Sequence, residues 1–397
     1  MTEAVASLAL LAPPEKALPP STQVLVDVSR AHGVSPITQL LDMMRLRHAK
    51  NGVYFEEYYS NRIYLPQHTK AQKKQFIGRK GNFNLNKRLS PFELTKTARG
   101  LLRDKIRFNA TIAEHGFRTT HTQAVVMQEG DAGGIPALRT VAEIEAFLLT
   151  KAEYPIFVKP QEGTRSVGSA LIEGIDPTTR ELKLFNGKRI VAGDFAREVL
   201  SEYASGFLIQ SALRQHPDLS KVAGPAVGTI RVVTVMRNDT PEVLYTLWKI
   251  PSPNAMSDNF WQDGSMLAEI DKDTGKLVQC RRGSGLTQEM METHPTSGHP
   301  FASVQIPHWD EVLDMTTRCH KLWPNFGVLG WDIAITEEGP SIIECNCNPF
   351  QLMFQLATGK GIYNETFAPI FDAVEARGKA LIAKYTQENE EAKKAKH

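Results

Sequence analysis

The chain has 397 residues, 42% of them hydrophobic and 23% charged, and its formal net charge is +2 at pH 7. This composition is that of a globular protein of about two to three domains, and its small net charge gives no electrostatic reason to expect nucleic-acid binding. No run approaches the ~20 apolar residues of a membrane helix, and the four cysteines include no Cys-x-x-Cys pair, so no membrane span, disulfide framework or zinc site is indicated. The start of the chain also lacks the basic residues of a signal peptide, so we expect a cytoplasmic protein.

The first hundred residues predict a mainly helical region. Residues 1–20 are rich in Ala and Pro and are expected to be loosely ordered, whereas residues 22–47 repeat apolar side chains at helical spacing. Residues 53–64 are rich in aromatic side chains, which fit a packed helical face. Residues 70–88 carry seven basic residues and no acidic one, and we favour a solvated loop, or one beside a bound ligand, over a docking site for an anionic partner.

The next segments predict a helix and then a strand. Residues 90–115 have a helical pattern that Gly116 ends, and a strand begins at Thr122. Lys105 lies within this predicted helix. Taken alone it would be a surface residue, since lysine is almost never fully buried.

Residues 154–160 predict an apolar strand that carries Lys159 near its end, and a loop containing Gly and Ser follows the strand. Gly163 and Gly168 permit positive φ and a close approach of the backbone. The loop could therefore present N–H groups to phosphate oxygens, with Lys159 as a nearby positive charge. It lacks the Gly-Lys-Ser/Thr ending of a P-loop, and an ordinary flexible hairpin loop is the alternative.

Two charged residues lie in later apolar strands. Arg231 lies in the run 229–235, where a charge is costly unless it is paired. Its guanidinium could stabilise a developing phosphoryl charge or a tetrahedral intermediate, and a salt bridge to a structural carboxylate is the alternative. Lys249, on the next predicted strand, is placed to reach the same point.

The most informative pattern is an antiparallel hairpin made by residues 330–335 and 341–348. The two runs are separated by Glu-Glu-Gly-Pro at 337–340, which is a turn composition. Because side chains alternate along a strand, the second run presents a polar face and a cysteine face. The polar face carries Glu344, Asn346 and Asn348, and the other face carries Cys345 and Cys347.

The register of the hairpin decides whether it forms a metal site. A five-residue loop would pair Ile335 with Ser341, which sets Asp332 opposite Glu344 and diagonal to Asn346. A slip of one residue would instead put Asp332 with the cysteines. In the expected register, hard oxygen ligands cluster as Mg²⁺ prefers, which suggests a magnesium-nucleotide site.

Together these motifs resemble the ATP-grasp superfamily. Its pattern is Phe-Val-Lys-Pro at 157–160, a Gly/Ser loop, and a distal Asp followed by Glu-x-Asn-x-Asn-Pro at 344–349; it covers residues 105 to 371 or so. Thr-Ile-Arg-Val-Val-Thr at 229–234 is similar to the branch called sugar-transfer-associated ATP-grasp. The resemblance implies an α+β ATP-grasp fold, with two α+β subdomains clasping ATP and a helical region before them.

The resemblance also implies roles for individual residues. Mg²⁺, with Mn²⁺ as an alternative ion, is expected on Asp332, Glu344 and Asn346. The ATP phosphates are expected on Lys105, Lys159, Gly163, Ser166, Val167 and Gly168. Adenine is expected at the strand end formed by Gln210, Ser211 and Leu213, although many relatives carry an acidic residue where this chain has Ser211. The expected catalytic residues are Arg231 and Lys249.

The implied activity is an ATP-dependent carboxylate–amine ligase that works through an acyl phosphate and converts ATP to ADP and phosphate. Its partners would be a small-molecule carboxylate and an amine, and a homodimer is compatible with the sequence. A small-molecule kinase on the same fold and a non-catalytic ATP-binding module are the alternatives. We expect an N-terminal region at 1–100, one subdomain at 101–206, a second at 207–385 and a charged tail at 386–397.

Overall fold

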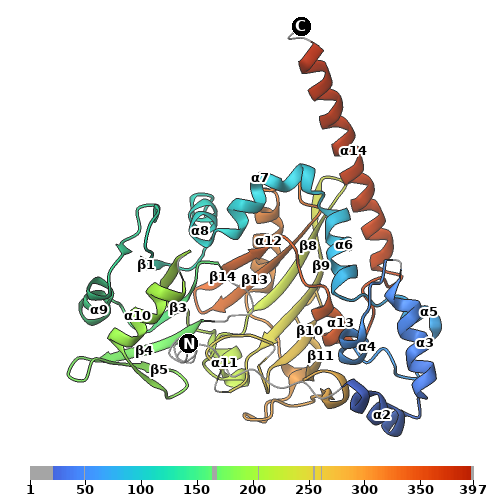
Figure 1. Cartoon of the computed structure of the whole chain (residues 1–397), viewed down its shortest axis with the longest axis horizontal. Helices are drawn as coiled ribbons and strands as arrows, with labels where there is room; N and C mark the ends of the chain where they lie inside the picture. The colour runs from blue at the N-terminus through green and yellow to red at the C-terminus, as the bar shows by residue number, and fades with distance from the viewer. Residues whose placement is uncertain are drawn as a thin grey trace.

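The computed structural model describes residues 21–48, 50–162, 168–203, 205–253, 255–260 and 262–394. Within these ranges the chain forms an N-terminal helical region and two seven-stranded sheets that lie beside each other (Figure 1). The predicted α+β class, with a helical N-terminal region, is therefore confirmed.

The N-terminal region is helical, as predicted, but the expected helix over residues 22–47 is divided in two. The break has local causes. Gly33 takes a left-handed conformation with φ +68°, and the Ser35 hydroxyl caps the start of the second helix by accepting a hydrogen bond from Thr38 N at 3.2 Å. The aromatic segment packs as expected, with Tyr58, Tyr59 and Tyr64 buried. The helices are α2 (Ser21–His32), α3 (Pro36–Arg47), α4 (Phe55–Ser60), α5 (Lys70–Lys73) and α6 (Arg79–Leu89).

The basic segment 70–88 is not a loop, so that prediction is wrong. Most of it lies in α5 and α6, and several of its charges are paired with acids on other elements. Lys73 pairs with Asp42 at 2.6 Å and Arg88 pairs with Glu375 at 3.0 Å. The acidic partners lie far away in the sequence. Their carboxylates neutralise part of the positive charge of this segment, so that it can pack as helices against the rest of the protein.

A predicted single helix over 90–115 is also divided, into α7 (Phe92–Arg103) and α8 (Lys105–Glu114). Asp104 makes the break, since its Oδ1 accepts from Ile106 N at 3.1 Å and Arg107 N at 3.2 Å. Lys105 is therefore the first residue of a helix instead of an interior one. Gly116 ends α8 with φ +78°, as expected.

The first sheet has the order β2-β1-β7-β3-β4-β5-β6, and α9 and α10 pack on it. In this sheet β1 and β2 pair in parallel, and all the other neighbouring strands pair antiparallel. Because β7 belongs to this sheet, the chain passes to the second sheet after Ser211, later than the expected boundary at 206/207. The elements are β1 (Thr122–Val126), β2 (Ala137–Leu138), α9 (Val141–Thr150), β3 (Ile156–Pro160), β4 (Ala170–Asp176), β5 (Glu181–Leu184), β6 (Arg189–Val191), α10 (Ala192–Glu202) and β7 (Phe207–Ser211).

The second sheet is antiparallel, in the order β12-β11-β10-β9-β8-β13-β14. One face packs Trp248 and Met266 in a core with α12, and the other packs Leu247 and Leu267 in a core with α13 and α14. The elements are α11 (Pro217–Ala223), β8 (Ile230–Arg237), β9 (Thr240–Ile250), β10 (Met266–Ile270), β11 (Leu277–Arg282), η1 (Gly285–Thr287), β12 (Glu289–Met290), η2 (Phe301–Ser303), α12 (Trp309–His320), β13 (Val328–Thr336), β14 (Gly339–Asn346), α13 (Leu352–Thr358) and α14 (Phe367–Lys394).

The C-terminal helix α14 begins against the second sheet, and its far end projects from the body (Figure 1). It includes the described part of the expected charged tail. No helix in the described ranges is both long enough and apolar enough to span a membrane.

Candidate active site

In the hairpin β13–β14, Asp332 pairs with Glu344 as expected, but the turn and the register that produce this pairing differ from the prediction. The turn is tighter than predicted, since Ile335 pairs with Pro340 and not with Ser341. A β-bulge then leaves Ile343 unpaired and restores the pairing of Asp332 with Glu344. Without this extra residue, Glu344 would turn to the opposite face of the sheet.

The two faces of β14 are those expected from alternation. Cys345 and Cys347 are buried in the core that contains α12. Glu344 and Asn346 lie half-buried on the other face, where Asn346 Nδ2 donates to Glu344 Oε1 at 3.2 Å. The cysteines are therefore packing residues, and the polar pair remains available for a ligand.

Asp332 lies at the centre of a buried charge network. Arg231, on the neighbouring strand β8, donates from Nε to Asp332 Oδ1 at 2.5 Å and from Nη2 to Oδ2 at 2.9 Å. Lys249, on β9, donates from Nζ to Asp332 Oδ2 at 3.1 Å and pairs with Asp258 Oδ2 at 2.8 Å. The Thr229 hydroxyl also donates to Asp258. Arg231 thus does make the salt bridge considered as an alternative, and its partner is itself a predicted site residue.

The electrostatics of this network follow from its pairing. Burial alone would raise the pKa of Asp332, but the charges of Arg231 and Lys249 hold it well below its usual range. Burial would lower the pKa of Lys249, and Asp258 and Asp332 together raise it above its ordinary value. Asp332 and Lys249 are therefore charged at neutral pH, and the two basic side chains lie against Asp332 and Asp258.

Asp258 was not among the predicted site residues. It lies in the segment that connects β9 to β10. The signal that could have identified it is an Asp-Asn pair that begins nine residues after Lys249. The contact itself depends on how the connection folds back.

Two lysines approach from the first half of the chain. Lys105, at the start of α8, donates from Nζ to Gln161 O at 2.8 Å, next to the predicted phosphate loop. Lys159, on β3, is buried with 7% of its surface exposed. No hydrogen bond or ion pair joins its ammonium to another residue in the part of the chain that the structure describes. A buried, unpartnered lysine is costly, which suggests an anionic ligand for it.

The pKa shifts tie these lysines to the second sheet. Burial and the charge of Lys105 together lower the pKa of Lys159 to about 8, although the Glu344 carboxylate opposes the shift. Burial also lowers the pKa of Lys105, again with Glu344 opposing. Lys105, Lys159 and Glu344 therefore share one electrostatic environment, although they come from α8, β3 and β14.

The predicted phosphate loop is only partly described. Gly163, Ser166 and Val167 lie outside the described residues. Gly168 has the expected positive φ, at +76°, but a Cβ placed there would collide with the Tyr203 side chain. Gly168 is thus required for packing within the first sheet's domain, which the sequence did not indicate.

The predicted adenine-binding strand end uses its side chains internally. Gln210 is buried and donates from Nε2 to Thr120 Oγ1 at 3.0 Å and to Thr122 Oγ1 at 2.9 Å. Ser211 Oγ accepts from Gln123 Nε2 at 3.0 Å. Leu213 is half-buried beyond the end of β7. Any contact of this segment with adenine would therefore come from backbone groups after Ser211.

The residues present fit a magnesium ion that is shared with phosphates. No group of three or more His, Cys, Asp or Glu residues within the described ranges is arranged to hold a metal by itself. Mg²⁺ needs less, because it is usually bound by one or two carboxylates together with substrate phosphates. Glu344 and Asn346 offer hard oxygens on one face, beside the two lysines. Asp332 has both oxygens engaged by cations, so it is the weakest of the three predicted ligands.

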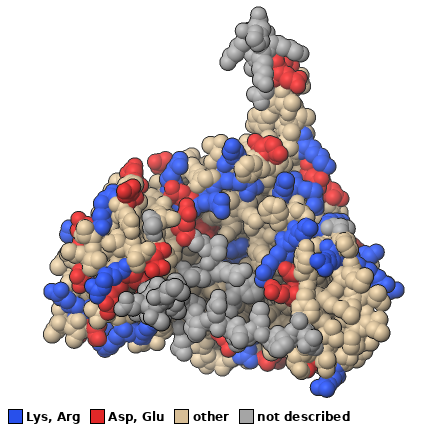
Figure 2. Space-filling model, in the orientation of Figure 1, with Lys and Arg blue, Asp and Glu red and all other residues tan. Residues whose placement is uncertain are grey.

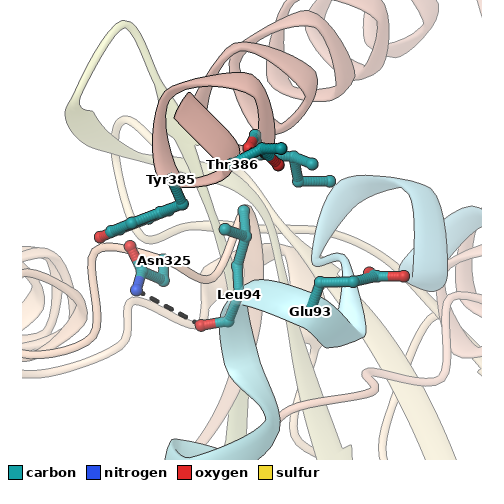
Figure 3. A pocket seen from close by; sticks show the side chains of 6 residues that line it. Glu93, Leu94, Asn325, Tyr385 and Thr386 are labelled. Carbon is teal, nitrogen blue, oxygen red and sulfur yellow. Dashed lines mark hydrogen bonds between the residues drawn. The ribbon is translucent and has the colours of Figure 1, made fainter. Parts of the chain in front are cut away.

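Two other surface features carry no candidate chemistry. A hollow of about 440 Å³ lies between α7 and α14, where Asn325 Nδ2 donates to Leu94 O at 3.3 Å (Figure 3). It includes none of the residues discussed above. On the face shown in Figure 2, basic and acidic side chains are interspersed, in keeping with the small net charge.

The comparisons with known proteins agree with this architecture. A family model described as sugar-transfer associated ATP-grasp matches residues 84–368, which is most of the chain. The match includes both sheets and every predicted site residue. A comparison with curated proteins finds no match.

Several solved structures are similar in fold at low sequence identity. A D-alanine–D-alanine ligase from Helicobacter pylori is 12% identical, with 75% of this chain and 69% of that chain covered and a TM-score of 0.42. The enzyme of the same name from Coxiella burnetii is 8% identical, with 74% and 62% covered and a TM-score of 0.41. The biotin carboxylase domain of a Hydrogenobacter thermophilus 2-oxoglutarate carboxylase is 10% identical, with 66% and 46% covered and a TM-score of 0.35. The chain spans less than two thirds of the last two structures, and we draw no functional conclusion from these neighbours.

Proposed function

Since the chain belongs to the sugar-transfer associated ATP-grasp family, we propose that it is an ATP-dependent ligase that joins a small-molecule carboxylate to an amine through an acyl phosphate. One observation carries the proposal. Lys105 and Lys159 from the first half of the chain share an electrostatic environment with Glu344, which pairs with the Arg231-bound Asp332 in the second.

The first requirement of such a ligase is to hold the nucleotide phosphates. In this proposal the ammonium groups of Lys105 and Lys159 bind phosphate oxygens. The phosphate then compensates the Lys159 ammonium for the hydration that it loses on burial. Glu344 and Asn346, with Asp332, would hold Mg²⁺, which would supply positive charge to neutralise the phosphates. Because the transition state of phosphoryl transfer is loose and anionic, catalysis consists mainly of positioning and charge neutralisation.

Arg231 and Lys249 have donors left for the reacting groups. A guanidinium carries five N–H groups and an ammonium three. Arg231 uses two on Asp332, and Lys249 uses two on Asp332 and Asp258. In the proposal the carboxylates fix the orientation of both cations, and their remaining N–H groups bind the substrate carboxylate and the transferred phosphoryl group.

The second requirement is an amine that displaces phosphate from the acyl phosphate. In the overall balance, ATP, carboxylate and amine become ADP, phosphate and amide. Lys159 and Lys105 would hold the released phosphate as they held the γ-phosphoryl group. The identity of the carboxylate and of the amine is left to experiment.

The test is to incubate the protein with Mg-ATP and pools of amino acids or sugar acids, with hydroxylamine as a general amine. A ligase should release ADP and phosphate in equal amounts and form a hydroxamate only when a carboxylate is present. A kinase would form ADP without an amine and leave a stable phosphorylated product. AMP and pyrophosphate as main products would indicate adenylation and overturn the acyl-phosphate proposal.

A further inference from the structure

A second group of basic residues lies where the N-terminal helical region meets β11. Arg62 follows α4, and Arg281 is in β11. Arg62 Nη1 donates to the backbone oxygen of Gln288 at 3.4 Å, and Arg281 Nη1 donates to Gln288 Oε1 at 3.2 Å. One residue therefore holds two guanidinium groups side by side.

This basic pair is separate from the candidate active site. Leu267, on β10, pairs with both Lys249 and Arg281, so the three side chains leave the same face of the sheet. Arg281 is two strands from Lys249, which corresponds to about 10 Å. Leu267 is fully buried beneath α13 and closes the direct path between them.

Neither guanidinium has an acidic partner. No ion pair joins Arg62 or Arg281 to a carboxylate among the residues that the structure describes. The acid of this neighbourhood, Glu269, accepts from Gln279 at 2.5 Å. The adjacent Arg282, by contrast, pairs with Glu289 at 2.6 Å. Two neighbouring positive charges thus lack the neutralisation that Arg282 receives from Glu289.

The helix end near Arg281 offsets only part of this charge. Arg281 Nη2 donates to Thr358 O at the C-terminus of α13, where the helix carries about half a negative charge. Burial lowers the pKa of Arg281 below its ordinary value, and the charge of Arg62 lowers it further, with Glu269 partly opposing. The repulsion between the two guanidinium groups therefore persists in the folded protein.

Two further features mark the place as incomplete. The Nε atoms of both arginines are buried and have no hydrogen-bond partner. Arg62 takes φ +54°, a left-handed conformation that is uncommon outside glycine and that costs free energy.

We propose that Arg62 and Arg281 form a binding site for a phosphate group, either free or carried by a small molecule. A phosphate carries about −1.5 to −2 charges at pH 7, which matches two guanidinium groups better than a single carboxylate does. Arginine also binds phosphate oxygens with two parallel hydrogen bonds. The site is independent of the proposed ligase chemistry, because it includes none of those residues.

The experiment measures binding of radiolabelled inorganic phosphate by equilibrium dialysis, with a saturating non-hydrolysable magnesium–ATP analogue present, so that the candidate nucleotide site is occupied up to its γ-phosphate position. We expect one phosphate per chain. Arg62→Gln and Arg281→Gln should each weaken binding about tenfold or more, as the loss of one charge-assisted hydrogen bond predicts. Arg281→Lys keeps the charge and should retain part of the affinity. The matched control is Arg282→Gln, on the same strand, which should bind like the unmodified protein.

Three outcomes would overturn the proposal. One is no phosphate bound at millimolar concentration, and another is equal binding by the unmodified protein and by Arg62→Gln. The third is succinate displacing phosphate with equal affinity, which would assign the site to carboxylates. Circular dichroism checks the fold of each variant, and if Arg281→Gln does not fold, Arg62→Gln and Arg281→Lys decide the matter.

Discussion

Arg231 and Asp332 form a two-fold hydrogen-bonded pair across the neighbouring strands β8 and β13, with N–O distances of 2.5 Å and 2.9 Å. Both side chains are more than nine-tenths buried. The pair connects two predicted roles, since it couples a candidate catalytic cation to a candidate metal ligand. It also means that neither residue can be changed without leaving a buried charge behind.

Asp332→Asn should therefore affect both stability and activity. Removing one partner of a buried pair typically costs about 3 to 5 kcal/mol, because the other charge stays buried and uncompensated. We expect a loss of this size in the free energy of unfolding, measured by urea titration, and loss of ATP turnover. Asp239→Asn is the control, since Asp239 is 80% exposed in its pair with Arg377 and should change stability by at most about 1 kcal/mol. Equal stability of the two variants would show that the Arg231–Asp332 pair does not contribute as described.

Glu344→Gln should separate ligand binding from folding. Glu344 is half-buried and has no ion pair shorter than 4.0 Å among the described residues, so we expect a change in stability within about 1 kcal/mol. ATP turnover should be abolished, because the strongest hard oxygen donor of the predicted magnesium site is lost. Glu337→Gln, in the exposed turn of the same hairpin, should leave both quantities unchanged. Normal turnover by Glu344→Gln would refute the metal assignment.

The pKa of Lys159, lowered to about 8 by burial, predicts a pH dependence of ATP binding. In the free protein the ammonium loses its proton as pH rises through about 8, so the charge that holds phosphate is lost there. We expect kcat/KM for ATP to fall above about pH 8. The stability of the free protein should change in the opposite direction. Since the unfolded chain binds more protons between about pH 8 and 10.5, the free energy of unfolding should rise with pH over that interval.

Lys159→Arg is the variant that checks this assignment. An arginine keeps its proton throughout this range, so the fall in kcat/KM should move to higher pH even if the overall rate is lower. A pH profile that is identical in the two proteins would mean that another group titrates. Lys151→Arg, on an exposed turn, should leave the profile unchanged.

Asp104→Ala should show that the helix break positions Lys105. Loss of this N-cap typically costs about 1 kcal/mol. It should also raise KM for ATP, because α8 then no longer begins at Lys105. Thr140→Ala removes an N-cap of the same kind from α9, where Thr140 Oγ1 accepts from Glu143 N at 3.2 Å. We expect the same loss of stability there with KM unchanged, and a matching KM increase in both variants would make the effect one of stability alone.

Much of the candidate site follows from local pattern. Strict alternation along 344–348 separates the polar residues from Cys345 and Cys347, and this holds in the structure because side chains on a strand must alternate. The family resemblance, carried by short motifs at 157–160, 229–234 and 344–349, agrees with the match over residues 84–368.

Other features depend on contacts that no local pattern contains. Segment 70–88 looked like a solvated loop because its acidic partners, Asp42 and Glu375, lie far away in the sequence. The pairing of Asp332 with Glu344 was expected from the wrong turn length, and it exists only because a bulge at Ile343 compensates. The position of a bulge depends on how both faces of the sheet pack, and the sequence of a single strand does not contain that information.

The sequence by itself determined which residues could bind a magnesium nucleotide, since residue type and alternation are local properties of the chain. Only the tertiary structure decided which of them meet. It set Arg231 and Lys249 against Asp332 and Asp258, buried Lys159 without an ion-pair partner in the described part of the chain, and placed Lys105 in the electrostatic environment of Glu344. The physical reason is that burial and Coulomb interactions depend on distance in space. The pKa values of Lys105 and Lys159 therefore depend on the folded arrangement and cannot be read from the sequence.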